Sequence, residues 1–140
     1  KMARAQAVAE RLLQKYPNNI INQLVLGRVQ MYRKQYENSE ATYKQVLTIS
    51  PNNERVHYYL QRLYLRWNKP ELSEQHANIY LSFNINDDQK AYSLFYKGNI
   101  YYQRQDWDEA ERLYRLAYRA NRMKRAKSRL ERIEQRREGN

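Results

Sequence analysis

The sequence of 140 residues contains no cysteine, which excludes disulfide bonds, thiolate metal sites and a cysteine nucleophile. It has only three glycines and three prolines, too little turn material for the many short connections of a β-sandwich. No apolar run approaches the roughly 20 residues that a membrane-spanning helix needs, so no transmembrane segment is predicted. Together these absences favour long helices joined by short loops.

Apolar residues are also scarce. They make up 41% of the chain, and the mean hydropathy is -1.10, which is polar for a globular protein. An elongated protein with a thin core reconciles this composition with a chain of about one domain's length. Tyrosine dominates the aromatic residues, with fourteen Tyr against two Trp and two Phe, and it can pack its ring while its hydroxyl stays at the edge of a thin core.

Acidic residues are few. Fifteen Asp and Glu stand against 26 Lys and Arg, which gives a net charge of +11. The excess gathers near the C-terminus, where residues 112–138 hold eleven basic residues and three acidic ones. Two interpretations stay open here, a solvated helix surface or a patch that binds anions. The candidate basic patch consists of Arg122, Lys124, Arg125, Lys127 and Arg129.

An internal repeat with a period of 34 residues organises the sequence. The tripeptide Pro17-Asn18-Asn19 recurs as Pro51-Asn52-Asn53 after one period. Further along, the register needs three extra residues, after which Gly27 matches Gly98. We place this insertion near Asn86-Asp87-Asp88, as a lengthened polar loop. A period of this length indicates a repeat protein.

With this register the chain resembles the tetratricopeptide repeat family, whose helix-turn-helix unit has the pattern W-x2-L-G-x2-Y, then A-x3-F, then P. The second unit is degenerate, with Gln61 where Gly is usual. The third unit matches best, through Gly98, Tyr101, Trp107, Ala110, Tyr114 and Ala117. The resemblance implies an all-α fold, a right-handed α-solenoid of antiparallel helix pairs (a superhelix like that of tetratricopeptide repeats) with a C-terminal capping helix.

The same register predicts one domain made of five parts. The first helix lacks a partner, so we expect the chain to be a fragment of a longer solenoid. The expected parts are the second helix of a partial repeat (1–19), a repeat (20–53), a degenerate repeat with the three-residue insertion (54–90), a repeat (91–124), and a basic capping helix and tail (125–140).

Individual residues support this scheme independently of the family name. Small residues such as Gly98 let two helices approach closely, while large ones fill the space beside them. Asn19 and Asn53 sit where a first helix should begin, and their side chains can cap free backbone N–H groups. Asp106 with Glu109 resembles a capping box.

The sequence contains few candidates for catalytic residues. The two histidines, His57 and His76, do not have the spacing of metal ligands. Helix capping and a solvated loop account for Asp87 and Asp88. The sequence contains no Gly-rich phosphate loop and no nucleophile elbow. We therefore expect no catalytic residue, metal ligand or cofactor, and a binding protein rather than an enzyme.

The family resemblance also implies a binding surface, because the first helix of each unit then lines a concave groove at fixed positions. Ile21, Leu24 and Phe95 fall on these positions too, and core packing is the alternative for them. The residues that chaperone-tail-binding members use are absent from the first unit, so a chaperone cofactor is not supported. The groove candidates are Arg28, Tyr32, Arg55, Tyr58, Arg62, Arg66, Tyr92, Asn99 and Tyr102.

Two classes of function follow from these candidates. The first is a protein-protein interaction scaffold that binds a peptide segment, expected to be acidic, in the groove as part of a larger assembly. The alternative is binding of a polyanion, either an acidic polysaccharide or nucleic acid, through the groove and the basic C-terminal helix. A third possibility is self-association of the protein through the ends of the solenoid. The compartment stays open between the cytoplasm and a bacterial envelope or periplasm.

Overall fold

The structure, a computed structural model, describes residues 1–139 and contains eight α-helices and no strand within that range. The expected all-α fold is confirmed. The helices are α1 (Met2–Lys15), α2 (Ile20–Tyr32), α3 (Tyr36–Ile49), α4 (Glu54–Arg66), α5 (Pro70–Leu81), α6 (Asp87–Gln103), α7 (Trp107–Asn121) and α8 (Lys124–Glu138).

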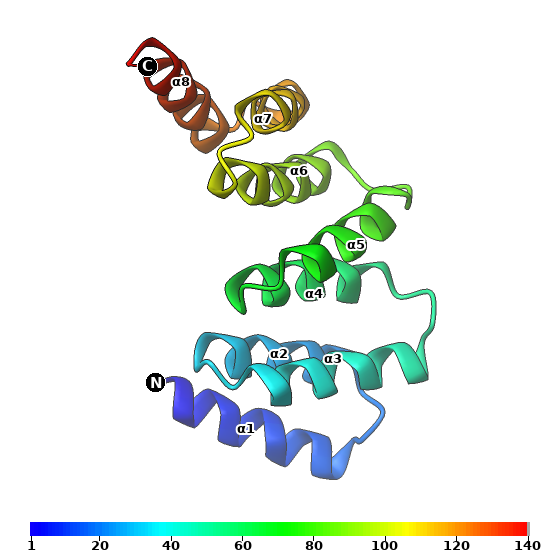
Figure 1. Ribbon diagram of the computed structural model, residues 1–140. Helices are drawn as coiled ribbons and strands as arrows, with labels where there is room; N and C mark the ends of the chain where they lie inside the picture. The colour runs from blue at the N-terminus through cyan, green and yellow to red at the C-terminus, as the bar shows by residue number, and fades with distance from the viewer. Residues whose placement is uncertain (140) are drawn as a thin grey trace.

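The helices form a stack of pairs. The most extensive contacts join α2 to α3, α4 to α5 and α6 to α7, and weaker ones join each pair to the next. Figure 1 shows the pairs following one another in chain order, with α1 and α8 at opposite ends of the stack. This is the solenoid that the 34-residue period predicts.

Close approach within a pair depends on a small residue facing a tyrosine. A Cβ atom added at Gly98 in α6 would lie 2.7 Å from Cε1 of Tyr114 in α7. Gly27 in α2 meets Tyr43 in α3 more closely still. Both tyrosine side chains are fully buried, so any larger residue at the glycine positions would displace a ring.

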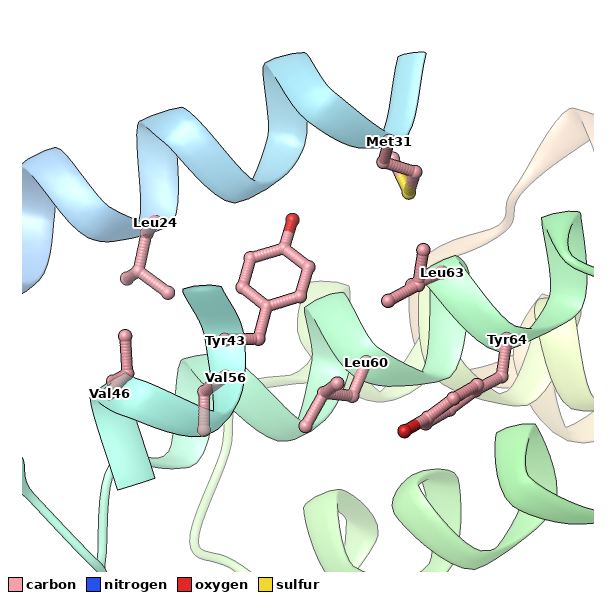
Figure 2. Packing of buried hydrophobic residues seen from close by; sticks show 8 residues of the cluster. All are labelled: Leu24, Met31, Tyr43, Val46, Val56, Leu60, Leu63 and Tyr64. Carbon is pink, nitrogen blue, oxygen red and sulfur yellow. The ribbon is translucent and has the colours of Figure 1, made fainter. Parts of the chain in front are cut away.

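The core is divided between the two halves of the stack. Figure 2 shows the first cluster, in which the Tyr43 ring points from α3 toward α2, between Leu24 and Met31. Polar contacts join neighbouring units at their boundaries, where the hydroxyl of Tyr64 in α4 donates to Glu40 in α3 at 2.5 Å and that of Tyr101 in α6 donates to Glu74 in α5. The second cluster contains Ala91, Phe95, Ala110, Tyr114, Ala117, Met123, Ala126 and Ile133.

The helix ends agree with most of the capping predictions. Oδ1 of Asn19 accepts the backbone N–H of Asn22 at 2.9 Å, and Asn53 caps α4 in the same way. The reciprocal capping box at Asp106 and Glu109 is wrong. Only the Asp106 side chain caps, because its own N–H already donates to a backbone carbonyl at 2.9 Å and the Glu109 carboxylate binds Arg112.

The three-residue insertion lengthens a helix rather than a loop. Helix α6 has 17 residues against 13 in α2 and α4, and its additional turn begins at Asp87. A capping box between Asn86 and Gln89 starts this turn, and Asp87 and Asp88 lie in it, where acidic side chains favour the positive end of the helix dipole. The expectation of a lengthened polar loop is therefore corrected.

Helix α8 packs on α7 and has a polar outer face. The guanidinium of Arg137 donates to Asp108 at 2.5 Å and to Glu111, which anchors the two helices. By register, four side chains of α8 would face a partner helix, and all four are polar and exposed, as a capping helix needs. They are Ser128, Glu131, Arg132 and Gln135.

Candidate functional site

One face of the stack, formed by α2, α4, α6 and α8, carries arginines that lie over aromatic rings. In α2, the guanidinium of Arg28 lies 5.5 Å from the ring centre of Tyr59. In α4, Arg66 lies 4.7 Å from the ring centre of Tyr32. Stacking of this kind is favourable and orders the long arginine side chain. We call this face the groove.

Arg62 lies at the centre of the groove and connects three of its helices. Its guanidinium lies 5.2 Å from the ring centre of Tyr96 in α6 and 5.9 Å from that of Tyr58 in α4. Its Nη2 also donates to the hydroxyl of Tyr32 in α2 at 3.3 Å. One guanidinium is therefore positioned by rings from three successive units.

Helix α8 extends the groove. Arg125 lies 4.5 Å from the ring centre of Phe95 and 5.8 Å from that of Tyr96. Arg129 and Arg136 lie 5.0 and 5.9 Å from the ring centre of Tyr102. The C-terminal helix therefore supplies side chains to the same surface as the helices of the full units.

This geometry divides the candidate basic patch. Arg125 and Arg129 belong to the groove, whereas Arg122 lies over Tyr118 in α7 at 5.3 Å. Lys124 and Lys127 are exposed, and Lys127 faces a recess between α7 and α8 that carboxylates line. Groove and patch are thus not two separate surfaces.

The groove arginines have no carboxylate partners. Within residues 1–139, arginines form ion pairs only at Arg104, Arg112, Arg115 and Arg137. Six guanidiniums on the groove lie over rings instead, which leaves their positive charge uncompensated by protein acids. The groove arginines are Arg28, Arg62, Arg66, Arg125, Arg129 and Arg136.

Two tyrosine hydroxyls respond to this charge. Burial acts to raise the pKa of Tyr32, but Arg62, Arg66 and Arg28 outweigh it, so the pKa lies below its ordinary value. The pKa of Tyr102 is lowered in the same way, because Arg136 and Arg129 outweigh burial. The lowered pKa of these two hydroxyls is consistent with a positive potential where the arginines approach them.

Besides a recess of about 390 Å³ beside α8, lined by Tyr102, Arg132, Gln135 and Arg136, two recesses open along the groove. The central recess, of about 360 Å³, is lined by Arg62, Leu65, Arg66, Tyr96, Asn99 and Arg125. In it, Oδ1 of Asn99 accepts the hydroxyl of Tyr114 at 2.5 Å, which leaves the amide nitrogen as a donor. The tyrosine recess, of about 250 Å³, is lined by Arg55, Tyr58, Tyr59, Tyr80, Asn86, Asp88, Gln89 and Tyr92.

The structure brings all nine groove candidates to the groove or its two recesses. Leu24 and Phe95 are core residues, 6% and 1% exposed, whereas Ile21 is 67% exposed. Sequence reasoning missed Tyr59, Tyr96 and Arg136. Tyr59 and Tyr96 occupy equivalent positions of two units, directly after the groove positions Tyr58 and Phe95. This recurrence of a tyrosine was the signal that could have identified both residues.

The histidines lie together, away from the groove arginines. Nδ1 of His57 and Nδ1 of His76 are 3.1 Å apart, so one ring donates a hydrogen bond to the other. Burial lowers the pKa of both side chains, that of His76 to about 4. In the described part of the chain, no three His, Cys, Asp or Glu side chains form a group that could hold a metal ion. The pair therefore packs as neutral rings between α4 and α5.

Comparisons with known proteins agree with the fold. The tetratricopeptide repeat profile matches residues 91–123, and no curated protein matches the sequence. A solved MamA RS-1 ArsTM double mutant shares 13% identity at a TM-score of 0.80, over 97% of this chain and 75% of that one. A second solved structure, of MamA protein, shares 16% identity at a TM-score of 0.76, over 94% of this chain and 71% of that one.

At these identities the likeness to the solved structures concerns the fold alone. Among the helices of residues 1–139, none is long and apolar enough to cross a membrane. Residues 91–123 match the tetratricopeptide repeat profile, and the fold of the chain is an α-solenoid similar to the two MamA structures.

Proposed function

We propose that the chain is a non-enzymatic protein-protein interaction scaffold that binds an acidic peptide segment in the groove, as part of a larger assembly. The observation that carries the proposal is the set of six groove arginines, all stacked on aromatic rings and none paired with a carboxylate. The solenoid fold supports it at the level of analogy, since such folds present extended concave binding surfaces.

Stacking prepares these arginines for carboxylate ligands. A ring covers one face of a guanidinium and leaves its edge, where the N–H donors lie, free for two-pronged hydrogen bonds. Because the side chain is already ordered by the ring, less conformational entropy is lost when a ligand binds. Arg62, held by three tyrosines, is the best prepared of the set.

The length of the groove sets the length of the peptide. Four helices at roughly 10 Å spacing span on the order of 30 Å from α2 to α8, which an extended segment of about nine residues covers. The groove also offers polar and aromatic contacts through Tyr32, Asn99 and Tyr102, and the tyrosine recess, of about 250 Å³, has the volume for one side chain. A ten-residue peptide is therefore a suitable probe.

Polyanion binding is the second candidate, because Arg125 and Arg129 add helix α8 to the same positive surface. An acidic polysaccharide or nucleic acid would neutralise many arginines at once and release condensed counterions. Its affinity would then depend on the total charge of the surface rather than on particular side chains.

The test is a comparison of two variants with the same net charge. Arg62→Gln with Arg66→Gln removes two charges inside the groove, and Lys124→Gln with Lys127→Gln removes two exposed charges outside it. Fluorescence anisotropy with a labelled ten-residue Asp/Glu-rich peptide measures each affinity.

We expect the groove variant to bind about tenfold to a hundredfold more weakly, since two charge-assisted hydrogen-bonding groups are lost. The control variant should bind within about twofold of the wild type, because exposed charges contribute mainly long-range attraction. Equal losses in the two variants would show that only net charge matters and would contradict a groove site.

A further inference from the structure

We propose that the central recess is a site for a dianionic phosphoryl group, carried by a side chain of the peptide that occupies the groove. The inference rests on the proposed function and adds the chemical class that the recess recognises. Its basis is the convergence of three guanidiniums, those of Arg62 and Arg66 from α4 and of Arg125 from α8, on one recess of about 360 Å³.

Shared rings hold the three guanidiniums in place. Tyr96 has Arg62 at 5.2 Å and Arg125 at 5.8 Å from its ring centre, so one ring from α6 orders arginines of α4 and α8. Tyr32 orders the other side, with Arg66 over its ring at 4.7 Å and its hydroxyl accepting from Arg62. The recess is therefore lined by three helices, α4, α6 and α8, with Tyr32 of α2 behind two of its arginines, and its charges are positioned before a ligand arrives.

Charge decides which anion fits. The ion pairs of residues 1–139 leave these three arginines without a carboxylate, so the recess has three positive groups to satisfy. A carboxylate offers one negative charge and two oxygens. A phosphoryl group offers about −1.5 to −2 charges at pH 7 and three strong acceptor oxygens, which arginine forks bind bidentately.

The neighbouring side chains support this assignment. The amide nitrogen of Asn99 supplies a neutral donor beside the three cations. The tyrosine recess differs, because there Asp88 accompanies Arg55, and it is lined mainly by rings. A recess beside α8 brings together Arg132 and Arg136, two guanidiniums against the three of the central recess, so the strongest selectivity for a dianion is expected at the central recess.

Three versions of one ten-residue acidic peptide test the inference, with phosphoserine, glutamate or serine at the central position. We expect the phosphoserine peptide to bind about tenfold or more tightly than the glutamate peptide, because it can satisfy all three arginines. Arg125→Gln should remove this preference, while Lys124→Gln, the same charge change one residue away and exposed, should keep it. Arg125→Lys keeps the charge without the fork and should lose most of the preference.

The outcomes separate this inference from the proposed function. Equal affinity for the phosphoserine and glutamate peptides, with both still dependent on Arg62, would overturn the phosphoryl site alone. No binding of any of the three peptides would overturn both. Tighter binding of a ten-nucleotide single-stranded RNA, lost in the same arginine variants, would assign the recess to a polyanion and overturn a peptide-borne phosphoryl group. Melting curves of each variant verify that the fold is retained.

Discussion

Gln61 and Ser93 form a two-point hydrogen-bonded link between α4 and α6. Nε2 of Gln61 donates to the backbone carbonyl of Ser93 at 2.9 Å, and Oγ of Ser93 donates back to Oε1 of Gln61 at 2.7 Å. Both side chains are fully buried. At the position where the other two units have glycine, the degenerate unit thus has a side chain that joins it to the next unit.

Loss of this link should destabilise the solenoid. Ser93→Ala leaves Oε1 of Gln61 buried without a donor, which should lower the free energy of unfolding by about 1 to 3 kcal/mol. Thr48→Ala is the control, because the exposed Thr48 hydroxyl bonds only to a carbonyl within α3. It should stay within about 0.5 kcal/mol of the wild type. Urea denaturation measures both, and equal stabilities of the two variants would mean that the link does not hold the units together.

Glycine is required at the contact with Tyr114. Gly98→Val should lower the free energy of unfolding by about 1 to 3 kcal/mol, because its side chain would press on a buried ring. At Gly139, beyond the end of α8, an added Cβ would meet only two backbone oxygens at ordinary van der Waals distances of 3.4 and 3.9 Å, so Gly139→Val should have little effect. Thermal melting of both variants measures the difference. If the Gly98 variant were as stable as the wild type, helices α6 and α7 could move apart without a loss of stability, which would contradict the prediction.

Much of this fold follows from the sequence, because a period of 34 residues and the residue types at the helix ends are local signals. Asn19 and Asn53 each cap the start of a helix as predicted, and Pro70 is the first residue of α5, a position that suits proline. The start of α6 was missed, since a polar stretch such as Asn86-Asp87-Asp88 suits a loop and a helical first turn equally well.

The groove was predictable only in part. Positions within one helix follow from helical spacing, so Arg62 and Arg66 could be placed on one face of α4. The contacts of Arg125 and Arg129 depend instead on how α8 stacks against α6, which no local pattern encodes. From the sequence alone, the basic segment is therefore interpreted as a separate patch. The packing of α8 in the solenoid brings Arg125 and Arg129 of this segment to the groove.

The histidine pair should make stability depend on pH. The folded state keeps His76 neutral because burial, His57 and Lys44 lower its pKa to about 4, although Glu40 opposes this. Unfolded histidine has a pKa of about 6.5, so the unfolded state binds protons first as the pH falls. Stability is then fully present above pH 6.5 and is lost progressively from about pH 6.5 toward pH 4.

His76→Gln isolates this contribution. Between pH 7.5 and 4.5 the wild type should lose about 1 kcal/mol more than the variant, after allowance for solvent screening of a partly exposed group. Carboxylates titrate in both proteins and cancel in the comparison. Urea denaturation at the two pH values provides the measurement, and identical pH dependences would show that the pair is not held neutral.

Salt dependence should separate the peptide from the polyanion. For the acidic ten-residue peptide, we expect the affinity to fall by less than about tenfold between 50 and 200 mM salt, because a few ordered contacts hold it. A polyanion that contacts all six groove arginines would lose about a thousandfold over the same range. Anisotropy titrations at several salt concentrations give the slope, and a steep slope for the peptide would favour counterion release over specific contacts.

Chemical shift mapping measures directly where the acidic peptide binds. Backbone amide spectra of the ¹⁵N-labelled protein are recorded while the ten-residue acidic peptide is added. The account predicts the largest saturable changes in α2, α4, α6 and α8, around Arg28, Arg62, Asn99 and Arg125, with small changes in α3, α5 and α7. Changes confined to the surface around Lys124 and Lys127, or concentrated on α3, α5 and α7, would contradict it.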